Sequence, residues 1–522
     1  MSADAKHQYP SLLAHRDPEV RGGQQLVAEK RQNKALQTSA APRAAFCAIS
    51  LKGHLRLAKA VAEELLGRGF IVDFLIGRDV EELHELDKTD AFNLHVIKEG
   101  GEMIGTISWQ NVASSTGRFG GSKIALMEEI ARSNTDESFD MCVEQWREML
   151  RILETSKPDV IICDHAMQTF QVWAESHGIP SVILHTPYFT TGKPGKTAQI
   201  TAWQTYQLMQ VMRLKQPLAH FQKISQALGI EAWKMDKNFG EGAKGAGARK
   251  AGGVAAHTFI FCEPELLNCD IKELPKRVHA VGPCLAAEVG QVDKDLKPWL
   301  DEAAEKGQRV IYVALGTLAN GFLDKRAVGQ MLSAFRELGD TWKVLWSLPK
   351  EQQHLVEDPH DNQVKVASFV KQRAVLAHPA VSVFLSHGGQ SSANESIFAG
   401  VPLVCMPLFC DQFEVADAVE THGLGLVFHK DELLSFWGRG GHRLATLLKS
   451  VAEEESFRSS IARHQHLMQL RSASHRAGEV VESIVQGGAD YLELWRPVAT
   501  RQATSGECAG GLRKCFEGLL NA

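Results

Sequence analysis

Short apolar runs alternate along the chain with longer amphipathic stretches. Residues 45–49 form an apolar run, residues 55–66 carry apolar side chains at helical spacing, and residues 70–76 are apolar again except for Asp73. Short continuous apolar runs predict buried strands, whereas helical spacing predicts an amphipathic helix. The first part of the chain therefore predicts a strand–helix–strand unit with parallel strands, from which α/β domains are built.

The same alternation starts afresh near Arg309. Here a strand is predicted at 310–315, a helix at 325–338 and a second strand at 343–346. Residues 456–485 also have a helical pattern. Two α/β domains of the doubly wound, Rossmann-like type are therefore expected. The other strand-like apolar runs are 160–163, 181–184, 258–262, 381–385 and 401–406.

The composition is that of a globular protein with more than one domain. The chain has 522 residues, of which 44% are hydrophobic and 23% charged, and its net charge is −5. This charge provides no basic surface, so no nucleic-acid partner is expected. The 10 cysteines include no CxxC spacing. Their scatter favours a reducing compartment.

No apolar run approaches the roughly 18 residues that a transmembrane helix needs. Residues 1–34 are polar and of mixed charge, unlike a secretory signal. We therefore expect a cytoplasmic, monomeric protein without a transmembrane segment.

The segment from Phe384 to Gln412 is the most informative part of the chain. An apolar run ends in Ser386-His387-Gly388-Gly389, and a predicted helix follows. Glycines let a phosphate approach the backbone, and the free N–H groups at a helix start bind it. Asp411 and Gln412 follow the next apolar run, and their side chains suit several hydroxyl groups. Phosphate at one end and hydroxyl groups at the other indicate a nucleotide sugar.

The segment from Phe369 to Gln412 resembles the nucleotide-sugar signature of the UDP-glycosyltransferases. These are inverting enzymes of the GT-B fold, an α/β architecture with two Rossmann-like domains and a cleft between them. The resemblance implies that Phe369 stacks on uracil with Gln372 beside it, and that Glu395 holds the ribose. It also implies that Asp411 and Gln412 grip the sugar. The implied diphosphate site consists of Thr317, His387, Gly389, Ser391 and Ser392.

The chain departs from the family's usual pattern in two places. The chain has Gln390-Ser391 where Trp-Asn is common, and Phe369 where Trp is usual. In addition, Glu395 follows Ser392 by three residues, so this pair also fits a capping box at a helix start. Phe369 also fits an ordinary place in the core. From the sequence, both alternatives remain open.

Transfer of a sugar to a hydroxyl group needs a base for the acceptor's proton, and histidine suits this near neutral pH. His54 follows the first predicted strand, and Asp164 follows the strand at 160–163. Open α/β sheets have their sites at these carboxyl ends of strands. Both positions match the family's catalytic pair, so the resemblance implies that His54 is the general base and that Asp164 orients it. His165 receives no role.

Neither a metal nor a cofactor is expected, because the sequence contains no motif such as HExxH and the UDP-sugar is a substrate. Aromatic and methionine side chains within 109–123 and 188–221 suggest a pocket for a small lipophilic acceptor. The Gly/Ala/Lys-rich residues 239–253 lack the ending of a phosphate loop, so a surface loop is expected there.

The elements and the resemblance together set the expected boundaries. A flexible leader at 1–43 precedes an acceptor-binding domain at 44–285 and a linker at 286–308. The remaining parts are a nucleotide-sugar domain at 309–455, helices at 456–490 that cross back to the first domain, and a tail at 491–522.

The expected function is inverting transfer of a sugar, with glucose as the default, from a UDP-sugar to a hydroxyl group of a small lipophilic acceptor. Two alternatives remain open. One is a non-catalytic protein of the same fold that holds a nucleotide sugar. The other is a GT-B epimerase or lipid-linked-sugar transferase.

Overall fold

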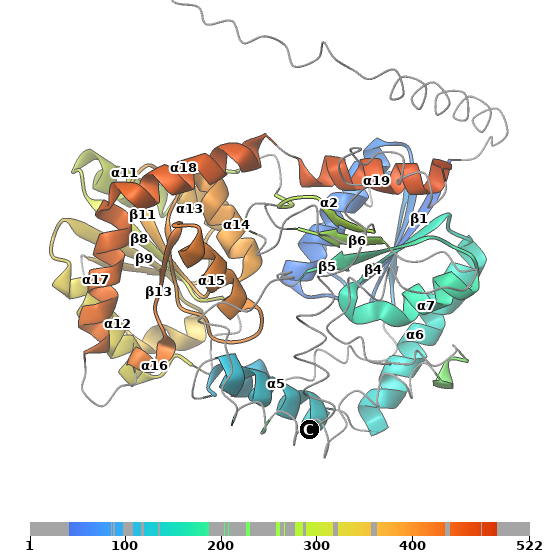
Figure 1. Cartoon of the computed structure of the whole chain (residues 1–522), viewed down its shortest axis with the longest axis horizontal. Helices are drawn as coiled ribbons and strands as arrows, with labels where there is room; N and C mark the ends of the chain where they lie inside the picture. The colour runs from blue at the N-terminus through green and yellow to red at the C-terminus, as the bar shows by residue number, and fades with distance from the viewer. Residues whose placement is uncertain are drawn as a thin grey trace, which may run out of the picture.

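The computed structural model contains two α/β domains side by side (Figure 1). Most of the expected leader and of 188–221, all of the tail and of the loop at 239–253, and Thr317 lie outside the residues that it describes. The described residues are 41–84, 86, 89–97, 108–115, 119–133, 136–186, 203, 207, 226–229, 257–261, 266, 277–285, 289–316, 322–356, 363–433, 439–470 and 472–487.

The first domain is built on a seven-stranded parallel sheet in the order β3-β2-β1-β4-β5-β6-β7. The winding reverses between β1 and β4, and the loops after these strands meet at the carboxyl edge of the sheet. The strands are β1 Arg43–Ala48, β2 Ile71–Ile76, β3 Phe92–Val96, β4 Val160–Asp164, β5 Ser181–His185, β6 His257–Ile260 and β7 Val278–Ala280. The helices are α2 Lys52–Gly67, α3 Glu81–His84, α4 Trp109–Ala113, α5 Phe119–Ser133, α6 Asp136–Ser156, η2 His165–Met167 and α7 Gln168–Ser176.

The second domain has a six-stranded parallel sheet in the order β10-β9-β8-β11-β12-β13, which reverses between β8 and β11. The strands are β8 Arg309–Ala314, β9 Trp342–Ser347, β10 Val364–Ala367, β11 Val381–Ser386, β12 Leu403–Cys405 and β13 Gly425–Val427. The helices are α11 Lys297–Glu305, α12 Lys325–Glu337, η6 Lys350–Leu355, α13 Gln372–Leu376, α14 Gln390–Ala399, α15 Gln412–Thr421, α16 Lys430–Leu433 and α17 Gly440–Glu453. Two more helices, α18 Glu455–Gln469 and α19 Ala473–Gly487, end the described chain.

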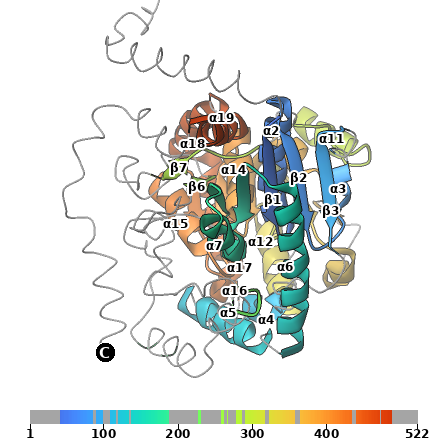
Figure 2. The same ribbon diagram turned by 90° about the vertical axis from the view of Figure 1, so that its right-hand side faces the viewer.

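Helices cover both faces of the first sheet (Figure 2). On the α2 face, Phe46 and Phe74 stack with ring centroids 5.4 Å apart. On the opposite face, Trp146 of α6 packs against Phe170 of α7 at 5.5 Å. A strand buried on both faces has apolar residues at successive positions, which is why these strands read as continuous apolar runs.

The helices α18 and α19 run along one side of the molecule from the second domain to the first (Figure 1). Ala477, Val481 and Ile484 of α19 join the same apolar core as Phe46 and Phe74. At the surface of this contact, Arg68, the C-cap of α2, pairs with Glu482 of α19 at 2.8 Å. The end of the described chain is thus part of the first domain's core.

The predicted α/β class and the two parallel sheets are confirmed. The apolar run at 401–406 forms a strand only at Leu403–Cys405, because Pro402 and Pro407 flank it and proline has no N–H for a ladder. The helical pattern at 456–485 divides into α18 and α19. α11 lies within the expected linker and contributes Leu300 to the core beside β8.

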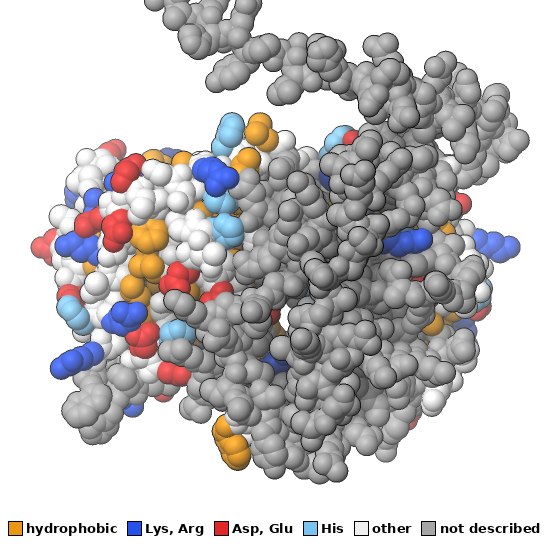
Figure 3. Space-filling model, viewed as in Figure 1, with side chains coloured by type: hydrophobic (Ala, Val, Ile, Leu, Met, Phe, Trp, Pro, Cys, Tyr) orange, Lys and Arg blue, Asp and Glu red, His pale blue; other side chains and the backbone are white. Residues whose placement is uncertain are grey.

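Charged side chains of both signs are interspersed on the face of the second domain seen in Figure 3. Among the described residues, no helix combines the length and the apolar character that crossing a membrane requires.

Gly425 offers a direct test of the packing between β12 and β13. A Cβ atom at this position would overlap the backbone carbonyl of Leu403 in the neighbouring strand. We expect Gly425→Ala to lower the free energy of unfolding by about 1–3 kcal/mol or more, measured by urea denaturation. Gly329→Ala is the control, because a Cβ there meets open space on α12. It should stabilise the protein by up to about 1 kcal/mol. Equal effects of the two substitutions would contradict this packing.

Candidate active site

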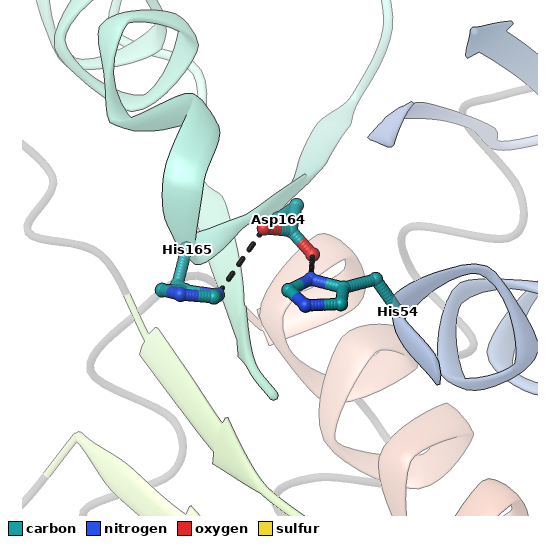
Figure 4. Close-up of side chains that lie close together, drawn as sticks. All are labelled: His54, Asp164 and His165. Atoms are coloured by element: carbon teal, nitrogen blue, oxygen red, sulfur yellow. Dashed lines mark hydrogen bonds and ion pairs between the residues drawn. The ribbon is translucent and has the colours of Figure 1, made fainter. Parts of the chain in front are cut away.

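The candidate catalytic pair lies where the first sheet reverses its winding. β1 and β4 are neighbours in the sheet, so the first turn of α2, with His54, comes close to the last position of β4, with Asp164. His54 Nδ1 lies 2.8 Å from Asp164 Oδ2 (Figure 4). The side chain of Asp164 is 3% exposed and that of His54 is 23% exposed. A buried carboxylate thus orients a histidine that solvent can reach.

Hydrogen bonds keep the Asp164 carboxylate ionised. The Ala166 N–H donates to Oδ1 at 2.9 Å, and His165 Nδ1 lies 3.2 Å from the same oxygen. Burial by itself raises the pKa of the Asp164 carboxyl, but hydrogen bonds from His165 and His54 outweigh burial and hold its pKa well below the usual range. The carboxylate can therefore stabilise a positive charge on His54 at neutral pH.

Two further side chains complete this cluster, and sequence reasoning gave neither of them a role. Thr186, just after β5, places its Oγ1 3.0 Å from His54 Nδ1 and 2.9 Å from His165 Nδ1. The rings of His54 and His165 stack with centroids 5.3 Å apart. The only sequence signal for Thr186 is its place after an apolar run, at the same edge of the sheet as Asp164.

His54, Asp164 and His165 are also the described residues that could together offer ligands to a metal ion, since their ligand atoms all lie within 4.8 Å of one another. The His54–Asp164 separation of 2.8 Å is a hydrogen-bond distance. Two ligands of a tetrahedral zinc ion, each about 2.0 Å from it, would lie roughly 3.3 Å apart. The geometry therefore fits a hydrogen-bonded pair better than a pair of zinc ligands.

On the opposite side, His387 lies where the second sheet reverses its winding, directly after β11. Its ring lies against the backbone of Gly316 and Gly389, where any Cβ would crowd Nε2. Its Nδ1 is buried and has no hydrogen-bond partner among the described residues. Burial lowers the pKa of His387 to about 4, although a hydrogen bond with the Ala314 carbonyl opposes the shift. The imidazole is therefore neutral at pH 7.

The structure brings together three residues of the expected donor site, Gln372 beside the uracil, Ser392 at the diphosphate and Glu395 at the ribose. Gln372 Nε2 donates to Glu395 Oε2 at 2.8 Å and to Ser392 Oγ at 3.2 Å. From the first domain, Arg56 Nη1 donates to Glu395 Oε1 at 3.2 Å. Burial raises the pKa of Glu395, and Arg56 and Gln372 oppose this shift. Sequence reasoning missed Arg56, whose only signal is its position two residues after His54.

The capping box suggested for Ser392 and Glu395 is wrong, and so is the place in the core suggested for Phe369. The N-cap of α14 is Gly389 and forms no side-chain cap, so Ser392 and Glu395 lie inside the helix and are not a capping box. The side chain of Phe369 is 69% exposed, so it is not part of the core. Ser391 lies in the first turn of α14 and is partly exposed.

The pair expected to grip the sugar lies at the start of α15. Asp411 is the N-cap of this helix and is partly buried. Gln412 is buried, and its Oε1 accepts hydrogen bonds from the N–H groups of Leu408 at 2.9 Å and Phe409 at 3.1 Å. The Gln412 amide is thus held by the loop that precedes it.

The unusual Gln390 has a structural explanation. Gln390 Nε2 and Asn394 Nδ2, both buried on α14, donate to the carbonyl of Phe261 at 2.8 and 3.0 Å. Phe261 directly follows β6 of the first domain. Gln390 therefore joins the two domains, a role that sequence position alone does not reveal.

The pKa of His387 predicts how stability depends on pH. Above pH 6.5 the imidazole is neutral in both the folded and the unfolded chain, so it contributes nothing. Between pH 6.5 and about 4, only the unfolded chain takes up the proton, so stability falls by about 1.4 kcal/mol per pH unit at most. We expect His387→Gln to show a shallower loss of unfolding free energy than the wild type over this range, measured by urea denaturation.

Ser391→Ala is the control for that experiment, because it alters the same helix start without removing a titrating group. Parallel pH curves for the wild type and His387→Gln would contradict the assigned pKa shift.

Comparison with known proteins bears on the family and on the fold. Residues 263–473 match the family model described as UDP-glucoronosyl and UDP-glucosyl transferase. UDP-glycosyltransferase 1 of Phaeomoniella chlamydospora is 29% identical over 44% of this chain and 46% of its own length. UDP-glycosyltransferase 84A3 of Arabidopsis thaliana is 28% identical over 48% of this chain and 51% of its own length. The chain thus spans about half the length of these relatives.

The fold is shared more widely than the sequence. The crystal structure of the glycotransferase of kitacinnamycin has a TM-score of 0.62 at 18% identity, and the match covers 85% of this chain and 100% of that one. The two-domain α/β architecture is therefore that of the GT-B glycosyltransferases. Over residues 263–473 the chain is therefore similar to the UDP-glycosyltransferase family, and over most of its length it shares the GT-B fold.

Proposed function

We propose that the protein is an inverting glycosyltransferase that moves a sugar, with glucose as the expected one, from a UDP-sugar to a hydroxyl group of a small lipophilic acceptor. The observation that carries the proposal is the 2.8 Å hydrogen bond between His54 and Asp164. Arg56, in the same helix as His54, contacts Glu395 of the second domain, so the pair lies near the expected donor site.

In the proposed reaction, His54 acts through Nε2, because its Nδ1 faces Asp164. Nε2 takes the proton of the acceptor's hydroxyl group while the oxygen attacks C1 of the sugar. The bond between C1 and the oxygen of UDP breaks with its electron pair on UDP, and the configuration at C1 inverts. Asp164 stabilises the imidazolium that forms.

The donor is proposed to bind the second domain. Uracil stacks on the exposed ring of Phe369 with Gln372 beside it, and Glu395, which Gln372 contacts, holds the ribose. The diphosphate lies over His387 and the start of α14, where Gly389, Ser391 and Ser392 leave N–H groups for it. The charge that grows on UDP is met by the backbone N–H groups at the start of α14, with His387 beside them. Thr317 is also proposed to contact the diphosphate, and this assignment rests on the sequence alone because Thr317 lies outside the described residues.

The acceptor is proposed to bind the first domain, next to His54. The segment 109–123, expected to line the acceptor pocket, is only partly available for this role. Val112 and Ala113 are fully buried in the core of the second domain. The lipophilic class of the acceptor therefore rests on the sequence of 188–221, of which only Trp203 and Gln207 are described.

The transferase activity is tested by UDP release from UDP-glucose in the presence of phenolic, terpenoid and sterol acceptors. We expect acceptor-dependent release by the wild type and a loss of about 100- to 10,000-fold in kcat for His54→Ala, because the base is removed. UDP should still bind the variant with nearly unchanged affinity, as measured by calorimetry.

The control is His84→Ala. His84 also pairs with a carboxylate, Asp79, at 2.6 Å, but both side chains are more than half exposed. This substitution should leave kcat unchanged. A His54→Ala rate within a few-fold of the wild type would contradict the catalytic assignment, and a wild type that binds no UDP would contradict the proposed function as a whole.

Phe369 offers a separate test of the donor site. Removing a stacking ring costs about 1–3 kcal/mol per base, so Phe369→Ala should weaken UDP binding by roughly 5- to 150-fold. Phe369→Trp should bind UDP at least as tightly as the wild type. Because the side chain is 69% exposed, neither change should alter the melting temperature appreciably. Unchanged UDP affinity in Phe369→Ala would place the base elsewhere.

A further inference from the structure

The helices α4 and α5, called here the α4–α5 arm, belong to the first domain by sequence but pack on the second. Val112 and Ala113 of α4 are fully buried in the same apolar core as Phe428 and Leu433 of the second domain. Leu126 of α5 packs against this core. Figure 1 shows α5 at the lower edge of the molecule, between the two domains.

Buried polar groups fix the arm in place. Lys430 of α16 is 3% exposed, and its Nζ donates to the carbonyls of Ala113 at 2.8 Å and Ser115 at 2.5 Å. Ala113 is the last residue of α4 and Ser115 lies just beyond it, so neither carbonyl has a partner within the helix. Because a buried ammonium without partners is costly, this contact favours one position of the arm on the second domain.

One contact of the arm reaches the loop that precedes the sugar pair. Ser122 of α5 is fully buried, and its Oγ donates to the carbonyl of Leu408 at 2.7 Å. That carbonyl belongs to the peptide unit between Leu408 and Phe409. The N–H group of the same peptide unit donates to Gln412 Oε1 at 3.1 Å. Ser122 and Gln412 therefore bind the two ends of one peptide unit.

A peptide unit is rigid and planar, so the direction of its N–H group follows the direction of its carbonyl. A hydroxyl group that fixes the Leu408 carbonyl also fixes the N–H group to which Gln412 Oε1 is bonded. The orientation of the Gln412 amide, including its Nε2 donor, then depends on Ser122. The positive charge of Lys123, the next residue of the arm, also acts on the helix that Gln412 begins. Burial and Asp411 raise the pKa of Glu414, and Lys123 opposes this rise.

We propose that Ser122 is a positioning residue for the donor sugar. It orients the Leu408–Phe409 peptide unit, which orients the side chain of Gln412, which in turn binds the sugar. Recognition of the sugar by the second domain thus depends on a residue of the first. The inference rests on the proposed function, because contact between Gln412 and the sugar is part of that proposal.

The test compares the binding of UDP and of UDP-glucose by calorimetry. Ser122→Ala should weaken UDP-glucose by about five- to tenfold, the effect of one lost buried hydrogen bond, and leave UDP within about twofold. A merely structural role would weaken both ligands alike. Ser483→Ala is the matched control, because its Oγ also donates to a backbone carbonyl at 2.7 Å, on α19 and away from this loop. It should change neither affinity.

A double substitution tests whether Ser122 acts on the sugar through Gln412. If Ser122 acts through Gln412, then Gln412→Ala should also weaken UDP-glucose selectively, and adding Ser122→Ala should cause little further loss. Independent, additive losses would overturn the inference. If Ser122→Ala fails to fold, Ser122→Cys keeps nearly the same volume with a weaker donor and should show the same selective loss.

The outcomes separate this inference from the proposed function. A wild type that binds neither UDP nor UDP-glucose contradicts both. A wild type that binds both, with a Ser122→Ala variant that is unchanged or weakened equally for the two ligands, contradicts only the role of Ser122.

Discussion

The site depends on one constraint of parallel sheets, the point at which the winding reverses. In each sheet the two strands at this point send their following segments to opposite faces, and the space between them stays open. The first sheet reverses between β1 and β4 and there holds His54 and Asp164. The second reverses between β8 and β11 and there holds Gly316 and His387. The proposed catalytic pair and the proposed donor site thus arise from the same topology used twice.

Much of this was predictable because it is local in sequence. Apolar runs predicted the strands, and residues directly after a strand share one edge of a parallel sheet, which brought His54 and Asp164 together. The sequence could not decide between two possible starts of the same helix. Ser392 and Glu395 fit a capping box by spacing, but the helix begins at Gln390 with Gly389 as its N-cap.

The contacts that the sequence did not reveal join segments far apart in the chain. Gln390 and Asn394 bind the carbonyl of Phe261, and Arg56 binds Glu395. Their partners lie 129 to 339 positions away, so no periodicity or motif records them. They depend on how the two domains pack, which follows from the whole core. The same reason explains why Val112 and Ala113, in the segment 109–123 expected to line an acceptor pocket, instead lie in the core of the second domain.

The packing of α19 on the first domain has a consequence for the order of synthesis. Ala477, Val481 and Ile484 fill part of the core that contains Phe46 and Phe74, although more than 400 residues separate them in the chain. While the ribosome makes the second domain, this face of the first domain lacks its cover and exposes apolar surface. A chain cut short before residue 473 leaves that surface permanently bare. The first domain is therefore synthesised before the second, but its core is complete only after α19 has been made.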